Sequence, residues 1–141
     1  RFDGKTVHFA DGAAEDFDAV IYATGYRISY PFFDAGLFDF DGALDIPLYL
    51  KMMPAGHSTV DFLGLFQPIG CIWPYAELQA RIVAAQVTGR LDRPADLEKR
   101  IAGEIASPHW NFERTPRHAI EVDIYDFGDA LRRELAAARP A

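Results

Sequence analysis

The chain has 141 residues, half of them apolar, and its 21 acidic and 14 basic side chains give a net charge of −7. This length suits one domain or a part of one, and an acidic balance without a Lys/Arg cluster disfavours a nucleic-acid role. No run of eighteen apolar residues occurs, so the sequence predicts no membrane-spanning helix.

The first predicted element is a β-hairpin. Residues 5–9 alternate as in a strand, and Asp11 and Gly12 form a strong turn signal. The sequence opens with Arg1 and enters this hairpin at once, which indicates either a trimmed or renumbered chain or a true fragment of a longer one.

Two continuous apolar runs come next. Residues 19–23 read AVIYA and residues 62–66 read FLGLF. Such runs are typical of strands that are buried on both faces of an α/β sheet. Residues 26–58 between them are rich in Pro, Gly and aromatic side chains, so we expect loops there, with one short strand at 48–50.

Helical periodicity dominates the rest of the sequence. The apolar spacing predicts helices over 74–88, 94–106 and 125–138. Pro74 suits the first turn of the first helix, and Gly89 suits the position just after its end. The predicted fold class is therefore α/β.

This predicted fold is not self-sufficient. Two or three buried strands need sheet neighbours, and the chain supplies few of them. Residues 107–122 have no regular pattern, so they add no further strand to the prediction.

The end of the first apolar run carries a resemblance to a known family. Residues 18–26 read DAVIYATGY and are followed by an aromatic-Pro segment at 30–32. This pattern resembles the Ala-Thr-Gly strand end of flavoproteins with two dinucleotide-binding domains, and in particular of flavin-containing monooxygenases. The small Thr24 and Gly25 would let the backbone pass close to a nucleotide and turn.

A second segment is more specific. Residues 64–81 read GLFQPIGCIWPYAELQAR, which is similar to the segment after the last sheet strand of the same family. The resemblance implies that a strand, a Gly-containing loop and a helix start lie along the flavin. Free N–H groups at a helix start suit the electron-rich pyrimidine edge of an isoalloxazine. We place the flavin near the four loop residues Gln67, Pro68, Ile69 and Gly70.

A third match lies near the end of the chain. Residues 117–123 read RHAIEVD and resemble the closing segment of the family, where the role is structural. Together the matches imply the C-terminal portion of a Rossmann-like FAD/NAD(P)-binding flavoprotein. Residues 1–90 would be the return half of the FAD-binding domain, and residues 91–141 a helical C-terminal cap.

The glycine-rich motif that holds the FAD pyrophosphate in this family does not occur in these 141 residues. No two of the eleven glycines are two positions apart, so Gly-x-Gly-x-x-Gly is absent for FAD and for NADPH alike. The implied partner is therefore a missing N-terminal nucleotide-binding segment.

The sequence offers no metal site and no catalytic side chain. The four histidines lack the spacing of metal ligands; they are His8, His57, His109 and His118. The single cysteine, Cys71, excludes an internal disulfide and favours a reducing compartment, the cytoplasm. Glu77 and Arg81 are four apart on a predicted helix, which indicates an ordinary salt bridge or a packing role.

The resemblance implies an NADPH- and FAD-dependent monooxygenase that oxygenates N- or S-nucleophiles or ketones of small-molecule substrates through a C4a-hydroperoxyflavin. The flavin carries that chemistry. The alternative is a non-catalytic flavoprotein remnant, or an interaction chain that needs a separate nucleotide-binding half. A reductase of related fold usually has Gly-Asp after its last strand, whereas the one Gly-Asp pair here is Gly128-Asp129, in the last helix. A homo-oligomer is left open.

Overall fold

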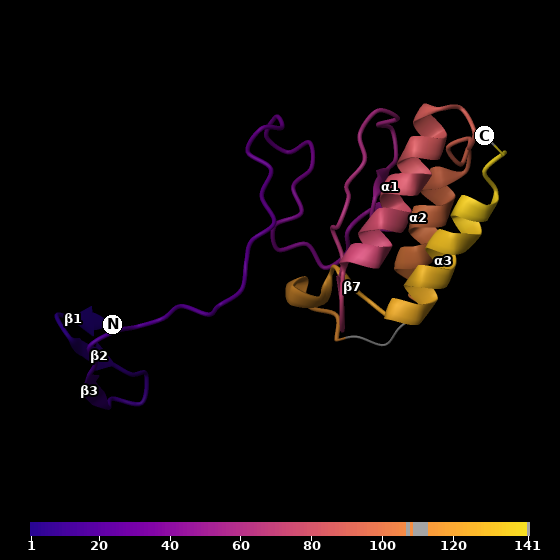
Figure 1. Ribbon diagram of the computed structural model, residues 1–141. Helices are drawn as coiled ribbons and strands as arrows, with labels where there is room; N and C mark the ends of the chain where they lie inside the picture. The colour runs from indigo at the N-terminus through magenta and orange to yellow at the C-terminus, as the bar shows by residue number, and fades with distance from the viewer. Residues whose placement is uncertain (107, 109–112, 141) are drawn as a thin grey trace.

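The computed structural model of the chain describes residues 1–106, 108 and 113–140. A small N-terminal sheet stands apart from a larger body of loops and three helices, and an extended segment joins the two (Figure 1). Six short strands come first along the chain, and the three α-helices follow with one further strand before the last of them, so the fold is mixed α/β, as the sequence predicted.

The N-terminal sheet contains three antiparallel strands, β1 (Phe2–Asp3), β2 (Thr6–His8) and β3 (Ala14–Asp16). The predicted hairpin is confirmed, because β2 pairs with β3 across the turn at residues 11 and 12. Gly12 adopts φ +91, a left-handed conformation that glycine reaches without a steric penalty.

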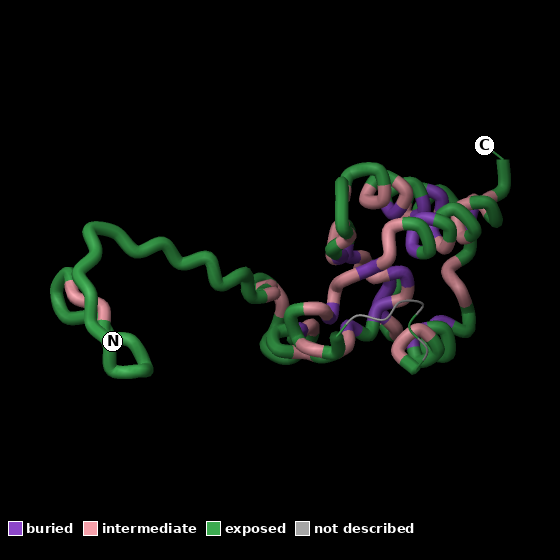
Figure 2. The backbone as a smooth tube through the Cα atoms, turned by 90° about the horizontal axis from the view of Figure 1, so that it is seen from below, coloured by how far each residue is buried: buried purple, intermediate pink, exposed green. Residues whose placement is uncertain are grey.

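The predicted buried strand at 19–23 is wrong for this structure. The segment is extended but belongs to no sheet, and Ile21 is 89% exposed. Figure 2 shows the whole stretch as exposed chain between the hairpin and the body. An apolar run becomes a strand only where another strand supplies hydrogen-bond partners. Within the described residues, none pairs with this run.

The predicted strand at 62–66 is also wrong, although its ends are buried as expected. Phe62 and Phe66 are buried, but Gly64 lies between them at φ +78 and interrupts the extended backbone. The strand begins afterwards as β6 (Gln67–Pro68), parallel to β7 (Glu121–Val122). The apolar pattern therefore predicted burial correctly only at the two ends of the run, since Leu63 between them is 51% exposed, and it predicted the local conformation incorrectly.

The predicted strand at 48–50 is confirmed as β4 (Leu48–Tyr49), which pairs antiparallel with β5 (Met53–Pro54). Leu50 and Lys51, in the turn between these strands, have φ values of 51 and 53. Such left-handed backbone is uncommon outside glycine, so the surroundings must hold this turn in place.

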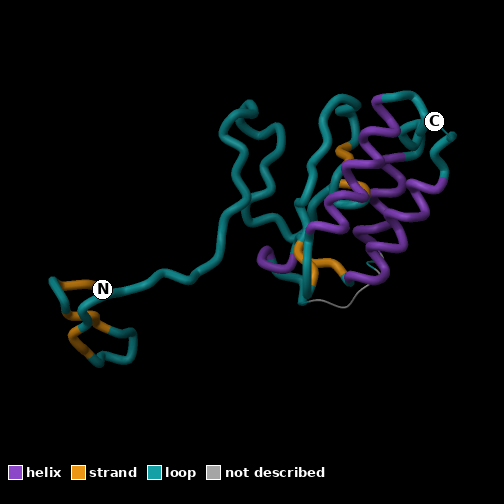
Figure 3. The backbone as a smooth tube through the Cα atoms, viewed as in Figure 1, coloured by secondary structure: helices purple, strands orange, loops and turns teal. Residues whose placement is uncertain are grey.

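All three predicted helices are present: α1 (Trp73–Val87), α2 (Leu97–Ala106) and α3 (Ile124–Ala136). They lie side by side at the C-terminal end of the molecule (Figure 3). A short 3₁₀ helix, η1 (Pro116–His118), precedes β7. The prediction of an irregular segment at 107–122 is therefore wrong at 116–118 and 121–122, and residues 107 and 109–112 lie outside the described residues.

The main core lies between the helices and the β4–β5 hairpin. Its fully buried side chains include Ile82 of α1, Leu131 of α3 and Met53 of β5. Burial of one such side chain contributes roughly 1.5–3 kcal/mol. A second cluster is largely aromatic and gathers Tyr30, Phe33, Phe38, Phe40 and Phe62 with edge-to-face and tilted rings.

None of the helices in the described ranges is long and apolar enough to cross a bilayer.

Candidate functional site

The loop predicted to face the flavin connects β6 to α1. Gln67 is anchored by its N–H, which donates to the Ile120 carbonyl at 2.7 Å, and Pro68 is half-buried. Beyond this anchor the chain turns outward, so that Ile69 is 88% exposed. The structure therefore brings the four predicted loop residues together on one surface.

Gly70 gives this loop its tight turn. Its φ of +131 lies in a region that favours glycine, and a Cβ built on it would lie 3.2 Å from Cδ1 of Ile124. The loop therefore rests against the start of α3, and a larger residue at position 70 would require the Ile124 side chain to move. This close approach is a reason for glycine at position 70 that the sequence pattern alone could not provide.

The start of α1 is open and lacks negative charge. Ile72 occupies the N-cap position and provides no side-chain hydrogen bond, and the first turn contains no acidic residue. The positive end of the helix dipole is therefore not compensated by a side chain of the helix itself. Trp73, 76% exposed, lies beside this end as a flat aromatic surface.

The segment 117–123 holds the loop in position, in agreement with its predicted structural role. Val122 is fully buried and its strand pairs with β6. Asp123 then caps α3, because its Oδ1 accepts the N–H groups of Tyr125 at 2.8 Å and Asp126 at 3.0 Å.

Thr24 and Gly25, the other two predicted site residues, do not join the loop. Both are exposed and lie in the extended segment that leaves the N-terminal sheet. Gly25 has φ +87, a conformation that favours glycine, but no turn or bend forms there, and Figures 1 and 2 show this segment standing away from the helices. The predicted site residues thus lie in two separate places, at 67–70 and at 24–25.

The sequence reasoning missed Gln79, a fully buried polar residue on α1. Its Oε1 accepts the N–H of Gly64 at 2.9 Å, and its Nε2 donates to the Leu50 carbonyl at 3.0 Å. A signal for it existed, since Gln79 precedes Ile82 and Ala85 at intervals of three along the buried face of α1.

Glu77 and Arg81 are both exposed, and no ion pair joins them in the structure. The predicted salt bridge between them is therefore wrong. Both residues line a shallow hollow beside the loop, together with the exposed Cys71.

Among the residues that the structure describes, no group of three or more His, Cys, Asp or Glu side chains is placed to hold a metal ion. His109, one of the four histidines considered, lies outside them.

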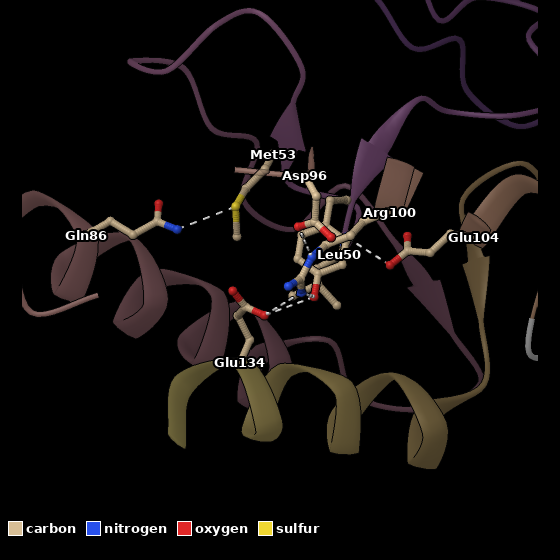
Figure 4. A network of polar contacts seen from close by, with 8 residues as sticks. Leu50, Met53, Gln86, Asp96, Arg100, Glu104 and Glu134 are labelled. Carbon is tan, nitrogen blue, oxygen red and sulfur yellow. Dashed lines mark hydrogen bonds and ion pairs between the residues drawn. The ribbon is translucent and has the colours of Figure 1, made fainter. Parts of the chain in front are cut away.

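A polar network joins Tyr49 of β4 to Arg100 of α2 and Glu134 of α3. Figure 4 labels the two partners, Arg100 and Glu134. The hydroxyl of Tyr49 donates to Oε2 of Glu134 and accepts from Nη1 of Arg100, both at 2.9 Å. Burial raises the pKa of Tyr49 to about 12; Glu134 adds to the shift and Arg100 opposes it. The hydroxyl therefore stays protonated near neutral pH and ties β4 to α2 and α3.

The deepest titratable groups are Lys51 and Glu104, which line a cavity of about 230 Å³. Lys51 donates to the Ala119 carbonyl at 3.0 Å, and Glu104 accepts the Leu50 N–H at 3.5 Å. Burial raises the pKa of Glu104 to about 7 and lowers that of Lys51. These groups hold the β4–β5 turn, so their first role is structural.

Comparison with known proteins extends the resemblance to almost the whole chain. The family model described as "Flavin-binding monooxygenase-like" matches residues 1–138. "Dimethylaniline monooxygenase [N-oxide-forming] 2" of Pan troglodytes is 33% identical over 138 residues, which cover 92% of this chain and 25% of the relative.

Two further relatives have similar scores. Human "Flavin-containing monooxygenase 5" is 33% identical over 147 residues, covering 99% of this chain and 27% of its own. "4-hydroxybenzoate brominase (decarboxylating)" of Marinomonas mediterranea is 33% identical over 138 residues, covering 94% of this chain and 26% of its own. The chain spans about a quarter of the length of the curated relatives that it matches.

Proposed function

Because the chain belongs to the flavin-binding monooxygenase-like family, we propose that it forms one wall of the flavin site of an NADPH- and FAD-dependent monooxygenase. The matched residues include both the loop at 67–70 and the three helices. In this proposal the intact protein is an enzyme, and this chain contributes binding and orientation rather than a catalytic side chain.

The observation that carries the proposal is the exposed loop in front of an uncapped, uncharged helix start. A flavin ring carries negative charge at its pyrimidine edge when reduced, and the positive end of α1 would stabilise that charge. Gln67, Pro68, Ile69 and Gly70 would line the ring, with Gly70 allowing the close backbone approach. The residues present therefore fit an isoalloxazine at this place.

The chemistry itself would come from the cofactor. When bound, FAD would supply the redox chemistry: it would accept a hydride from NADPH and activate O₂, so that one oxygen atom passes to a nitrogen or sulfur nucleophile or a ketone and the other leaves as water. The part of this chain is to hold the ring edge and to exclude water with Ile69 and Trp73, which are otherwise exposed apolar surface.

Thr24 and Gly25 would meet the cofactor only when the exposed segment at 19–23 becomes part of a larger Rossmann-like sheet. We therefore propose that a nucleotide-binding segment supplies the neighbouring strands and the pyrophosphate site. In that arrangement residues 1–90 form the return half of the FAD-binding domain and residues 91–141 its helical cap. The proposed location is the cytoplasm.

The test is an absorbance spectrum of the holoprotein that contains this chain, recorded with and without NADPH under air. A flavin band at about 450 nm that NADPH bleaches and O₂ restores is expected. Dimethylaniline, a thioether, a ketone and bromide with 4-hydroxybenzoate are then compared as acceptors, because relatives named for two such reactions match at the same 33% identity. If the intact protein purifies without flavin, this result would contradict the proposal and favour an interaction chain.

A further inference from the structure

The side chain of Gln79 connects two loops by forming a hydrogen bond with the backbone of each. Its exposed fraction is 0%, and both ends of its amide are used, one by the Gly64 N–H and the other by the Leu50 carbonyl. An amide side chain has a carbonyl oxygen that accepts and an NH₂ group that donates. Gln79 therefore satisfies two buried backbone groups with one side chain.

The first of these loops leads directly to the candidate flavin site. It is fixed at three points before it emerges at Ile69: Gly64 by Gln79, Phe66 by its ring packed 4.8 Å from that of Phe127, and Gln67 by the Ile120 carbonyl. The Gln79 bond is the earliest of the three. It also fixes the loop to the same helix whose start faces the site.

The second loop is the left-handed turn at Leu50 and Lys51. Each non-glycine residue in this conformation costs roughly 1–2 kcal/mol, so the turn depends on contacts around it. Two side chains form hydrogen bonds with the backbone of Leu50. Gln79 donates to its carbonyl, and Glu104 accepts from its N–H. Gln79 thus couples a strained turn to the loop at 64–70.

We propose that Gln79 is a positioning residue for the flavin: its amide sets the position of the 64–70 loop relative to the start of α1. This inference rests on the proposed function, since it takes the flavin to lie against residues 67–70. Loss of the amide frees Gly64 while the anchors at Phe66 and Gln67 remain. The loop then keeps its fold but no longer holds the ring at a fixed distance from the helix end.

Gln86 provides a matched control on the same helix. Its Nε2 donates to the sulfur of Met53 at 3.5 Å, so it also bonds the β4–β5 hairpin, but it makes no bond to the 64–70 loop (Figure 4). Gln79→Met and Gln86→Met each remove one side-chain amide from α1. A general loss of helix or hairpin stability appears in both variants, whereas an effect through the loop appears only in the first.

The experiment compares the flavin-loaded holoprotein and its Gln79→Met, Gln79→Glu and Gln86→Met variants. In Gln79→Met we expect a shifted flavin absorbance band and an FAD dissociation rate raised about fivefold, the order set by one lost buried hydrogen bond. The Gly64 amide should exchange with deuterium faster in this variant. Gln86→Met should change neither the spectrum nor the dissociation rate.

Gln79→Glu adds a pH signature that ties any effect to the hydrogen bond that the side chain donates to the Leu50 carbonyl. A protonated carboxyl accepts from Gly64 and donates to Leu50 as the amide does, whereas a carboxylate cannot donate. Flavin retention in this variant should therefore recover as the pH is lowered. The inference is overturned if the spectrum and FAD release of both Gln79 variants match wild type, or if Gln86→Met changes them equally. If the intact wild-type protein does not bind flavin, this result contradicts the proposed function itself.

Discussion

The carboxyl group of Glu104 lies largely buried on α2, facing the Leu50 N–H and the ammonium group of Lys51. Burial raises its pKa from 4.5 to about 7, while the hydrogen bond and Lys51 act in the opposite direction. Burial likewise lowers the pKa of Lys51, and Glu104 and Asp45 oppose that change. The protonation of this group therefore changes within the physiological pH range.

Glu104 should make the chain less stable as the pH rises. A carboxyl group whose pKa is raised by folding favours the folded state fully below its unfolded pKa, and this contribution is lost as the pH rises through the folded value. Between about pH 4.5 and 7 we expect a loss of up to about 3 kcal/mol. Glu104→Gln keeps an acceptor for Leu50 and should flatten this dependence.

Urea unfolding of the 141-residue chain at acid and alkaline pH checks this prediction. Glu77→Gln, an exposed change on α1, serves as the control and should keep the wild-type pH dependence. Equal pH dependence in wild type and Glu104→Gln would show that the buried carboxyl is not the source.

Gly70 tests the placement of the flavin at the level of one residue. Gly70→Val places a branched side chain at φ +131 and against Ile124, so we expect a stability loss of roughly 1–3 kcal/mol and weaker flavin binding in the holoprotein. Gly36→Val shares the left-handed backbone, φ +84, but has open space around it. Its flavin content should remain at the wild-type level, and unchanged flavin content in Gly70→Val would contradict the placement.

At the scale of elements, the packing of α3 on α1 depends on Gly128. A Cβ at this position would lie 2.5 Å from Cε1 of Tyr75, so the ring would have to move. Gly128→Ala should therefore destabilise the chain by about 1–3 kcal/mol, although alanine is the better helix former. Gly103→Ala on α2 has open space and should stabilise by roughly 0.5–1 kcal/mol.

Thermal unfolding of both variants gives the comparison. The loss in Gly128→Ala should disappear in a Tyr75→Ala background, because the clash needs the ring. A stabilised Gly128→Ala in the wild-type background would mean that α1 and α3 are not packed as the structure has them.

The helices could be predicted from the sequence because their signals are local. Apolar spacing together with Pro74 and Gly89 defined α1 to within one residue at each end, and the other helices to within a few residues. Asp123, which caps α3, was read only as part of a matched motif. Its capping role depends on the side-chain geometry that begins the helix.

The N-terminal hairpin and β4 could also be predicted, because each pairs with a neighbour close in sequence, but the other strands could not, because their pairing is not local. The run at 19–23 has the composition of a buried strand and no partner among the described residues, whereas β6 and β7 lack an apolar run and pair across the chain. The loop at 67–70 was predicted from a resemblance. Its support from Gln79 was not, because a buried amide is recognisable only from the backbone groups that it meets.

At the scale of the whole molecule, large apolar side chains remain exposed on several parts of the chain. The extended segment has Ile21, Tyr22 and Tyr26, and the surroundings of the candidate site have Ile69, Trp73 and Tyr125; Phe32 and Val87 are exposed elsewhere. Exposed apolar groups of this size mark surfaces that contact another molecule or another part of a protein. The structure is thus consistent with an incomplete sheet.

The 141-residue chain should therefore self-associate at micromolar concentration. Sedimentation velocity over a concentration series measures this directly, and Ile21→Asp with Ile69→Asp should reduce the association more than two changes of polar surface residues, such as Glu98→Gln and Asp129→Asn. A chain that stays monomeric across the series would show that these surfaces do not require a partner.

A second prediction for the whole molecule concerns FAD binding by the 141-residue chain alone. No Gly-x-Gly-x-x-Gly occurs in it, so it offers no site for the pyrophosphate. We expect the purified chain to lack the flavin band at about 450 nm. A yellow protein with one FAD per chain would contradict this expectation.

The central claim is that the flavin ring lies against residues 67–70 at the start of α1. Hydrogen–deuterium exchange of the intact protein, measured with and without bound FAD, tests it most directly. The account predicts that FAD slows exchange at the amides of Ile69, Gly70 and Trp73. The amides of the residues at the end of α1, around Val87, should exchange at the same rate in both states. Unchanged exchange across 67–73 in a fully FAD-loaded protein would contradict it.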